Sequence, residues 1–386
     1  MSSLDDFAQA KLAALESEHL RRKLVVTTRR GGALIERGGR QLISFSCNDY
    51  LGLSAHPTLA EAARDAMQKY GVGAAASRLV TGNHPLYDAL EDRLARLKGT
   101  AAACVFGSGY LANTGIIPAL VGGDDLVAID ALSHACLWAG ARLAGATVVP
   151  YPHNDVVRLR ALLGERRGRH GKALILTDGV FSMDGDLAPL VELGQLARDF
   201  DAWLMADDAH GIGVVGHGRG STFAGERPAD VPLQMGTLSK AIGAYGGYLC
   251  ASAPVIEFIK NRARTLVYST GLPPPIVAAA IAALDFIAAN PDYAAQPLRK
   301  ATAFTRRAGL AEAASPIVPV IIGEADDTLA AAHILEAEGF LAVPIRPPTV
   351  PAGTARLRLA FTACHEDADI ARLADVVRTR ILRPAP

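Results

Sequence analysis

From about residue 100 to residue 251 the chain alternates between short apolar runs and longer stretches with helical periodicity. The apolar runs cover residues 102–106, 126–129, 147–150, 173–177, 202–206, 233–235 and 248–251, and helical stretches such as 154–167 and 187–200 lie between them. Continuously apolar strands separated by helices are typical of a mainly parallel sheet that helices cover on both faces. Ligands of such sheets bind beyond the carboxyl ends of the strands, so the polar residues that follow each run are the candidate site.

The segments before and after this alternation predict the rest of the fold. Residues 4–24 have apolar side chains near helical spacing, and Gly31-Gly32 and Gly38-Gly39 predict turns around short strands. Further expected elements are a strand at 42–45, an Ala-rich helix ending near 290, strands at 317–322, 342–345 and 356–360, and helices at 327–338 and 367–378. We therefore expect an α/β chain with an N-terminal helix and short β segment (1–45), a large domain (46–290) and a smaller C-terminal α+β domain (291–386).

The composition excludes several classes of protein. Half of the 386 residues are apolar and a fifth are charged, which suits a large core and excludes a mainly disordered chain. Lys plus Arg and Asp plus Glu both number 39, so no overall charge favours binding to nucleic acid or to an anionic membrane.

We expect no targeting segment and no membrane span. The polar start Ser2-Ser3-Leu4-Asp5-Asp6 lacks the apolar region of a signal peptide. The most apolar stretch, 275–289, contains Asp285 and is too short to cross a bilayer. The five cysteines are scattered singly, which favours a reducing cytoplasmic location and predicts neither disulfides nor a metal site.

Two acids and a histidine follow the apolar run 202–206, in the order Asp207-Asp208-Ala209-His210. A carboxylate at a strand end can pair with a protonated heterocyclic nitrogen, and a nearby histidine can bond to a phenolic oxygen. Asp207 and His210 are therefore candidate contacts of an aromatic cofactor. The alternative, in which Asp207 caps the following turn and His210 is structural, fits this motif equally well.

A lysine and two hydroxyls follow the run 233–235, in the order Gly236-Thr237-Leu238-Ser239-Lys240. A lysine that binds an aldehyde must be oriented and partly desolvated so that its amine is available. Thr237 could donate to a phosphate. Taken alone, Lys240 is better explained as an ordinary solvated lysine.

Two further constellations lie at strand ends. Gly107-Ser108-Gly109-Tyr110 follows the run 102–106 and opens a helix, where free backbone N–H groups suit a phosphate. Ser133-His134 follows the run 126–129, and the His134 ring could stack on a planar cofactor. The alternative for each is structural: an ordinary glycine turn and a satisfied histidine.

In combination these motifs resemble those of the α-oxoamine synthases, pyridoxal-phosphate (PLP) enzymes with the aspartate-aminotransferase fold, which is PLP fold type I. The matching segments are Asn48-Asp49-Tyr50-Leu51-Gly52-Leu53, Arg78-Leu79-Val80-Thr81-Gly82-Asn83, Gly107-Ser108-Gly109-Tyr110, Ser133-His134, Phe181-Ser182-Met183-Asp184-Gly185, Asp207-Asp208-Ala209-His210-Gly211, Thr237-Leu238-Ser239-Lys240 and Tyr268-Ser269-Thr270. The resemblance extends from about residue 20 to residue 380. Leu238-Ser239 and Gly271-Leu272 depart from the commonest family residues without removing a group that the chemistry needs.

The resemblance implies a PLP-dependent acyltransferase and a role for each matching residue. Lys240 would bind the PLP aldehyde and act as a base, Asp207 would pair with the ring nitrogen, His210 would bond to the phenolic oxygen and His134 would stack on the ring. The other implied cofactor contacts are Gly109, Tyr110, Ser182 and Thr237, with Ser269 and Thr270 reaching the neighbouring PLP in a homodimer.

Within the family, the segment Ile345-Arg346-Pro347-Pro348-Thr349 and its continuation to Arg358 most resemble the branch that condenses L-alanine with a pimeloyl thioester in biotin biosynthesis. The substrate contacts implied are Arg21, Asn48, His134, Arg346 and Thr349, with Arg346 on the amino-acid carboxylate and Arg21 and Thr349 on the acyl group. The thioester could be that of CoA or of an acyl-carrier protein.

Two alternatives remain. One is another α-oxoamine synthase, which would use glycine or serine with a different acyl thioester. The other is a non-catalytic relative, either a partner subunit or a sensor; the presence of Lys240 and the lack of a basic helix-turn-helix extension count against it.

Overall fold

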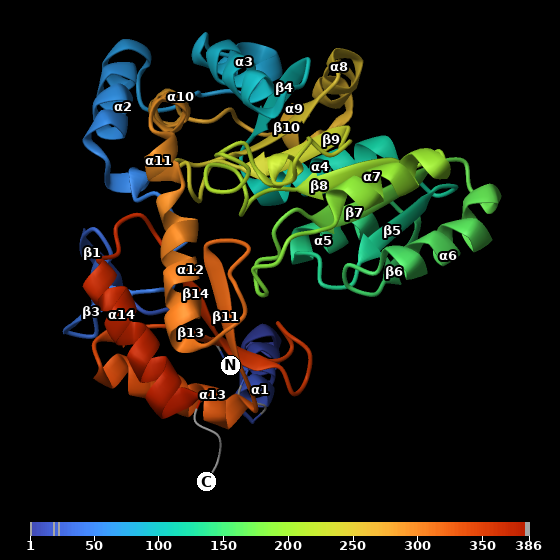
Figure 1. Cartoon of the computed structure of the whole chain (residues 1–386). Coiled ribbons are helices and arrows are strands. Elements are labelled where there is room, and N and C mark those ends of the chain that lie inside the picture. The colour runs from blue at the N-terminus through green and yellow to red at the C-terminus, as the bar shows by residue number, and fades with distance from the viewer. Residues whose placement is uncertain (1, 18–19, 22–23, 383–386) are drawn as a thin grey trace.

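The computed structural model describes residues 2–17, 20–21 and 24–382, and its centre is a mixed β-sheet (Figure 1). In this part of the chain seven strands have the order β4-β10-β9-β8-β7-β5-β6. Their bounds are β4 (Ala102–Phe106), β5 (Leu126–Asp130), β6 (Thr147–Tyr151), β7 (Ala173–Asp178), β8 (Trp203–Asp207), β9 (Leu233–Thr237) and β10 (Gly247–Ala251). Only β10 runs antiparallel to its neighbours β4 and β9. Each apolar run predicted from the sequence is one of these strands, and the predicted sheet is confirmed.

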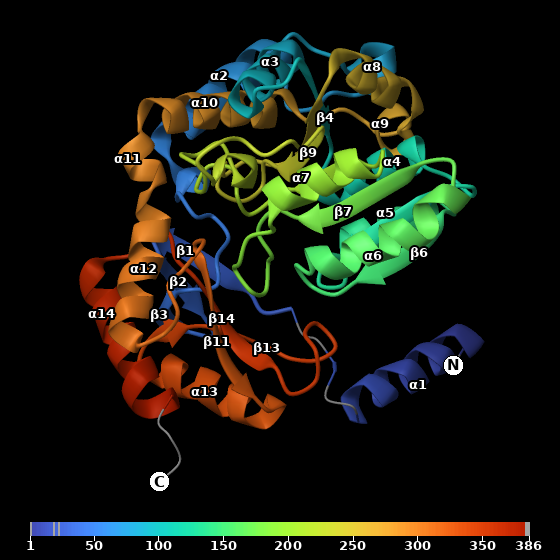
Figure 2. The ribbon, with the colours of Figure 1, turned by 45° about the vertical axis from the view of Figure 1, so that its right-hand side comes forward.

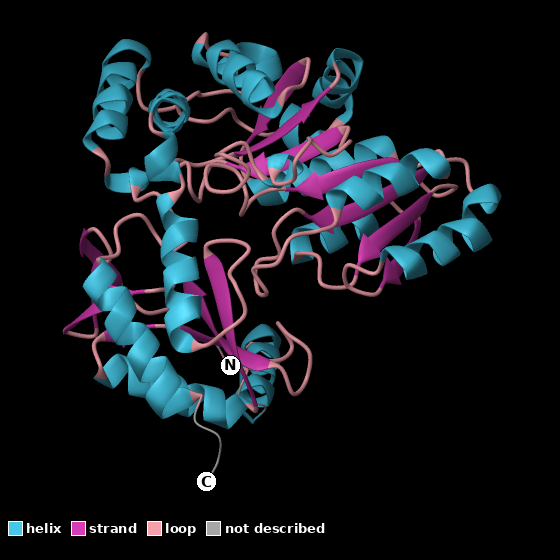
Figure 3. Cartoon of the chain, in the orientation of Figure 1, coloured by secondary structure: helices cyan, strands magenta, loops and turns pink. Residues whose placement is uncertain are grey.

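Helices cover both faces of this sheet (Figure 3), because most side chains on both sides of its strands are apolar. On one face the packed helices are α4 (Gly109–Leu120), α5 (Ala135–Leu143), α8 (Ala253–Arg262) and α9 (Arg264–Val267). On the other face they are α3 (Leu86–Lys98), α6 (Val156–Arg166), α7 (Leu190–Asp199) and α10 (Pro274–Ala289), with α2 (Pro57–Tyr70) packed on α10. The fold expected from the resemblance is confirmed.

Side-chain caps start the helices that follow the strand ends. The Ser108 hydroxyl accepts a hydrogen bond from the N–H of Leu111 at 3.1 Å and begins α4. The His134 ring accepts from the N–H of Cys136 at 3.2 Å and begins α5. Because a cap satisfies N–H groups that the helix itself leaves free, these residues fix where each loop turns into a helix.

The C-terminal part forms a second, smaller unit, in which β11 (Ile317–Gly323), β14 (Ala355–Ala360) and β13 (Val343–Ile345) pair antiparallel. Its helices are α12 (Gln296–Ala308), α13 (Ala325–Ala337) and α14 (Asp367–Val376), linked to α10 by α11 (Pro291–Ala294). A separate apolar core, which includes Phe304, Leu335, Leu357 and Phe361, holds this unit together.

The N-terminal strands join this C-terminal unit. The strands β1 (Thr27–Gly31), β2 (Leu34–Arg37) and β3 (Arg40–Ser44) form antiparallel hairpins, and β3 pairs in parallel with β12 (Phe340–Leu341). The hairpin turns fall at the predicted glycine pairs, where Gly32 and Gly38 have φ of 54° and 58°. Positive φ suits glycine because it has no Cβ. Residues far apart in the sequence therefore share one sheet.

The first helix differs from its prediction over residues 4–24. Helix α1 (Ser3–Ser17) ends at Ser17, and of the seven residues that follow, 18–19 and 22–23 lie outside the described residues. None of its residues is buried, and Figure 2 shows it apart from the rest of the chain. Among the described helices none can cross a membrane by itself, and only α10 with residues 291–308, bent by 100°, has the length and composition as a pair.

Candidate active site

A cavity of about 250 Å³ lies at the carboxyl ends of the parallel strands. Its lining includes eight of the predicted cofactor contacts: Gly109, Tyr110, His134, Ser182, Asp207, His210, Thr237 and Lys240. A larger cavity of about 730 Å³, around Trp203, Leu233 and Ala251, lies at the other end of the sheet and contains none of the predicted residues. The predicted cofactor contacts therefore lie at the smaller cavity.

Asp207 is held rigidly at the end of β8. Its side chain is buried, and its Oδ2 accepts a hydrogen bond from Asn113 Nδ2 of α4 at 2.7 Å. Its Oδ1 accepts from the N–H of Ala209 at 3.0 Å. Hydrogen bonds of this kind stabilise a carboxylate, so Asp207 can present a fixed negative charge to a cationic ring nitrogen.

A second acid lies beside it. Asp178, at the end of β7, is buried, and Oδ1 accepts from the N–H of His134 at 3.2 Å. Burial and the neighbouring Asp207 raise the pKa of Asp178 well above its usual range. Two close carboxylates cannot both ionise cheaply, so Asp178 takes up a proton more readily while it fixes the backbone of His134.

His210 belongs to a hydrogen-bonded chain of side chains. Its Nδ1 lies 2.6 Å from the hydroxyl of Tyr50, which receives a bond of 3.4 Å from Arg358 Nη2. Burial raises the pKa of Tyr50 to about 12, so its hydroxyl keeps its proton and donates to Nδ1. Burial, with the charges of Lys240 and Arg358, holds the pKa of His210 well below its usual range. The neutral ring therefore has its proton on Nε2 and can donate to an anionic oxygen.

Lys240 follows β9 and lines the same cavity. Burial lowers the pKa of its amine, and the nearby carboxylates Asp207 and Asp178 only partly offset this effect. A lowered pKa increases the fraction of neutral amine, which is the form that attacks an aldehyde or takes a proton. The motif alone did not show whether the Lys240 amine is desolvated, and the structure places this amine where it is desolvated.

The start of α4 and the end of β9 form a small cradle. The Thr237 hydroxyl donates to the backbone oxygen of Gly246 at 2.7 Å and lies 2.8 Å from the hydroxyl of Ser239. A Cβ added at Gly109 would lie 3.3 Å from Met235 Cε and 3.5 Å from the Cβ of Thr237, so the helix start lies beside the end of β9. A helix N-terminus beside hydroxyl groups suits a phosphate. Together, the amine, carboxylate, imidazoles and cradle fit PLP.

The other predicted residues lie away from this lining. Thr270 forms an isolated β-bridge with Ser77 and is exposed, and Ser269 precedes it. Arg21 bonds to Glu16 of α1 at 2.8 Å. Arg346 is partly buried just after β13, and Thr349 is exposed three residues later. Their predicted contacts with the cofactor and substrate stay predictions.

Four residues of the site were not predicted as contacts from the sequence: Tyr50, Asn113, Asp178 and Arg358. Arg358 lies on β14, and its guanidinium is buried without a carboxylate partner in the described part of the chain. It bonds to Asn48 Oδ1 at 3.1 Å and to the backbone oxygen of Ser182. Two arginines, Arg356 and Arg358, inside a strand of otherwise apolar residues were the available signal, since arginine is rarely buried without a function or a partner.

One protein-family model matches most of this chain. The family model described as aminotransferase class I and II matches residues 40–377. The chain belongs to this family.

Similar proteins indicate which group within this family the chain resembles. An 8-amino-7-oxononanoate synthase from Beijerinckia indica is 60% identical and covers 98% of this chain and 98% of its own length. The protein of the same name from Granulibacter bethesdensis is 59% identical, with 98% of each chain covered. The resemblance to the α-oxoamine synthases is confirmed.

Solved structures give the same fold. The serine palmitoyltransferase of Sphingomonas wittichii superposes with a TM-score of 0.90 at 30% identity, over 98% of this chain and 97% of that chain. A structure of SPT with PLP superposes with a TM-score of 0.87 at 28% identity, over 98% of both chains.

Proposed function

We propose that this chain catalyses the decarboxylative condensation of L-alanine with a pimeloyl thioester. The products are 8-amino-7-oxononanoate, CO2 and the free thiol, and the reaction belongs to biotin biosynthesis. The observation that carries the proposal is the single cavity that brings Lys240, Asp207, His210 and His134 together. The names of relatives at about 60% identity over nearly the full chain support the choice of substrates.

The protein is a PLP-dependent acyltransferase. When bound, PLP supplies a protonated aromatic ring that withdraws electrons from the carbon to be deprotonated. Asp207 would pair with the ring nitrogen and hold its proton there, because its fixed carboxylate favours the cationic form. His210 would donate from Nε2 to the phenolic oxygen, and His134, which lines the cavity, would stack on the ring.

The remaining steps fall to Lys240 and to an arginine. The Lys240 amine, with its lowered pKa, takes the α-proton of alanine and later returns a proton. Such proton transfer by a positioned group contributes about 10²- to 10⁴-fold to a rate. The buried Arg358 guanidinium is suited to bind the alanine carboxylate, because a planar fork orients a carboxylate through two bonds. Arg346, proposed for this role from the sequence, is the rival candidate.

We also propose that the chain acts as a cytoplasmic homodimer. Leu4 and Phe7 of α1 are 71% and 59% exposed, and a short helix that buries nothing is marginally stable. A second copy would cover this apolar face and bring Ser269 and Thr270 to its neighbour's phosphate. Light scattering should give twice the mass of one chain, and Phe7→Glu should shift the mass toward that of one chain.

The experiment that tests the function is a measurement of thiol release. L-alanine with pimeloyl-CoA or pimeloyl-carrier protein is compared with glycine plus acetyl- or succinyl-CoA, and with serine plus a long acyl-CoA, which the similarity to serine palmitoyltransferase makes the second candidate. We expect a preference for alanine with a pimeloyl thioester, and a preference for glycine or serine would contradict the proposal. Lys240→Ala should lose at least about 100-fold in rate, whereas Lys69→Ala, at an exposed lysine, should not.

A further inference from the structure

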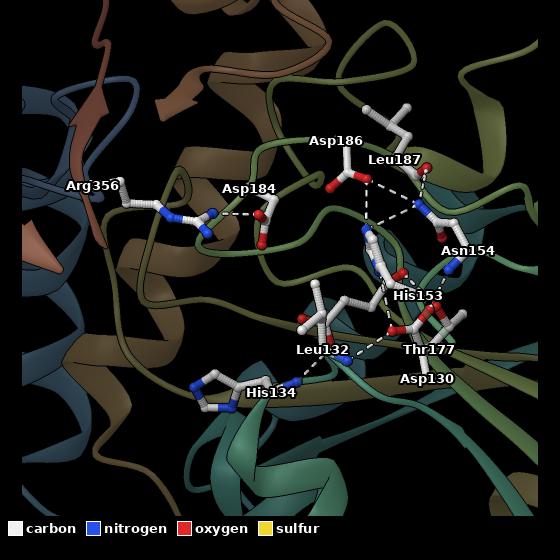
Figure 4. A network of polar contacts seen from close by, with 11 residues as sticks. Asp130, Leu132, His134, His153, Asn154, Thr177, Asp184, Asp186, Leu187 and Arg356 are labelled. Carbon is white, nitrogen blue, oxygen red and sulfur yellow. Dashed lines mark hydrogen bonds and ion pairs between the residues drawn. The ribbon is translucent and has the colours of Figure 1, made fainter. Parts of the chain in front are cut away.

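His153 lies outside the cavity, just after β6, and both of its ring nitrogens face carboxylates (Figure 4). Nδ1 is 3.1 Å from Asp130 Oδ1, and Nε2 is 2.9 Å from Asp186 Oδ2. The ring packs edge-on against Phe181, with centroids 4.4 Å apart. A histidine bonded through both nitrogens to acids has a single orientation and must donate both protons.

Asp130 connects His153 to the loop that carries His134. This residue ends β5 and is fully buried. Oδ1 also accepts from the N–H of Leu132 at 2.8 Å, and Oδ2 accepts from the N–H of Asn154 at 2.8 Å. These bonds shape the short turn from Asp130 to His134, so the position of the His134 ring depends on where Asp130 is held.

Asp186 connects His153 to the loop that carries Ser182. Its Oδ2 also accepts from Asn154 Nδ2 at 2.9 Å, and its backbone oxygen accepts from the N–H of Phe181 at 3.0 Å. On the same loop, Asp184 pairs with Arg356, and the backbone oxygen of Ser182 accepts from Arg358. The loop is therefore fixed at one side by His153 and at the other by the strand β14.

The electrostatics agree with an imidazole that is charged at neutral pH. Burial alone would lower the pKa of His153, but the bonds to Asp130 and Asp186 outweigh it and raise the pKa to about 10. These two carboxylates are the titratable groups that the described structure places against the ring. The ion pairs therefore persist at neutral pH.

We propose that His153 is a positioning residue of the active site: through Asp130 and Asp186 it holds the loop that carries His134 against the loop that carries Ser182. The two loops, which lie on either side of the cofactor pocket, are then held at a fixed separation. This inference rests on the proposed function only in so far as these loops hold PLP.

The test compares His153→Gln with His333→Gln, which places the same substitution on an exposed part of α13. Loss of a supporting contact around a catalytic group typically costs about 10- to 100-fold. We expect the PLP dissociation constant of His153→Gln to rise and its kcat to fall within that range, with little change in the KM for alanine. Amide exchange of residues 131–137 and 179–188 in the PLP-free protein should also become faster.

Two of these measurements do not depend on the substrates. PLP affinity and amide exchange need neither alanine nor a thioester, so failure of the wild-type enzyme to use them would count against the proposed function alone. PLP affinity and exchange in His153→Gln within about twofold of those in His333→Gln, the usual error of such comparisons, would overturn the inference.

Asp186→Asn provides a second variant if His153→Gln does not fold. The Asp186 side chain is 42% exposed, so its change to asparagine keeps the fold and removes one ion pair. We expect a smaller loss of PLP affinity and of loop protection, and the double variant should lose no more than His153→Gln alone. Unchanged amide exchange in Asp186→Asn, or additive losses in the double variant, would refute the proposed role of His153.

Raising the pH gives an independent signature. The wild-type protein should lose PLP affinity and loop protection as the pH rises through about 10, because His153 then loses the proton shared with the acids. In His153→Gln this component of the pH dependence should be missing. An identical alkaline profile in both proteins would also contradict the proposal.

Discussion

At the scale of single residues, the site depends on charged groups that are buried beside one another. Burial, together with the charges of Lys240 and Arg358, lowers the pKa of His210, and burial together with Arg358 lowers that of Lys240. Burying a cation without an anion is costly, yet the described structure gives Arg358 no carboxylate. The carboxylate of a bound substrate would supply the negative charge that Arg358 lacks.

We test which of the two arginines binds the alanine carboxylate by comparing Arg358→Met with Arg346→Met. Hydrogen bonds to charged groups are worth about 1.5–3 kcal/mol, so Arg358→Met should raise the KM for alanine by about 10- to 150-fold. Arg358→Lys should recover only part of the loss, because lysine keeps the charge without the fork. Steady-state kinetics with alanine varied checks this, and a large effect in Arg346→Met with none in Arg358→Met would restore the prediction made from the sequence.

At the scale of elements, the close packing of α4 and α5 places the donor that holds Asp207. Asn113 of α4 faces Gly140 of α5, where an added Cβ would lie 2.6 Å from the Asn113 backbone oxygen and 2.7 Å from Ile117 Cδ1. The glycine therefore sets the separation of the two helices. Because Asn113 Nδ2 bonds to Asp207, the same packing determines how the carboxylate meets the cofactor.

Gly140→Ala should destabilise the protein by about 1–3 kcal/mol, since overpacking forces backbone and side chains to shift. The matched control is Gly164→Ala in α6, where an added Cβ would meet only Phe200 at 3.9 Å. That substitution should stabilise by up to about 1 kcal/mol through helix propensity. Denaturant unfolding measures both, and PLP affinity should fall in Gly140→Ala only. Equal effects of the two substitutions would contradict this account.

At the scale of the whole molecule, the N-terminal strands are tied to the C-terminal unit. The His365 ring donates from Nε2 to the Ser44 backbone oxygen at 3.1 Å and accepts at Nδ1 from the N–H of Thr362 at 2.9 Å. It stacks on Phe45 at a centroid distance of 3.9 Å. Burial lowers the pKa of His365 to about 4, so the folded protein keeps the ring neutral.

The lowered pKa of His365 predicts that the protein loses stability in acid. The unfolded chain binds the proton near pH 6.5, whereas the folded chain binds it only near pH 4. Protonation therefore favours unfolding, and about 3 kcal/mol should be lost as the pH falls from 6.5 to 4. In His365→Gln this component should be missing, at a cost of about 1–3 kcal/mol at pH 7 from the altered bonds. Urea unfolding at several pH values, with His333→Gln as control, checks both; equal acid slopes in all three proteins would refute the assignment.

Local sequence patterns determined much of this protein. The seven strands of the central sheet, the helix α10, the strands β11, β13 and β14 and the helices α13 and α14 follow from apolar periodicity and turn residues, because each depends on neighbours in the chain. The residues at strand ends were predictable for a related reason: the carboxyl ends of parallel strands converge wherever such a sheet forms. For this reason Asp207, His210, Thr237 and Lys240 line one cavity, and their roles there stay predictions.

Only the tertiary structure decided the contacts between distant segments. The pairing of β3 with β12 links residues about 300 positions apart, and the bonds of Arg358 to Asn48 and Ser182 join three separate parts of the chain. No local pattern encodes such contacts, since each depends on how whole units pack. The helix over residues 4–24 was predicted too long because spacing cannot show whether a face has anything to pack on. The sequence thus determined which strand-end groups lie together at the cavity, and the packing of the units determined how these groups are held.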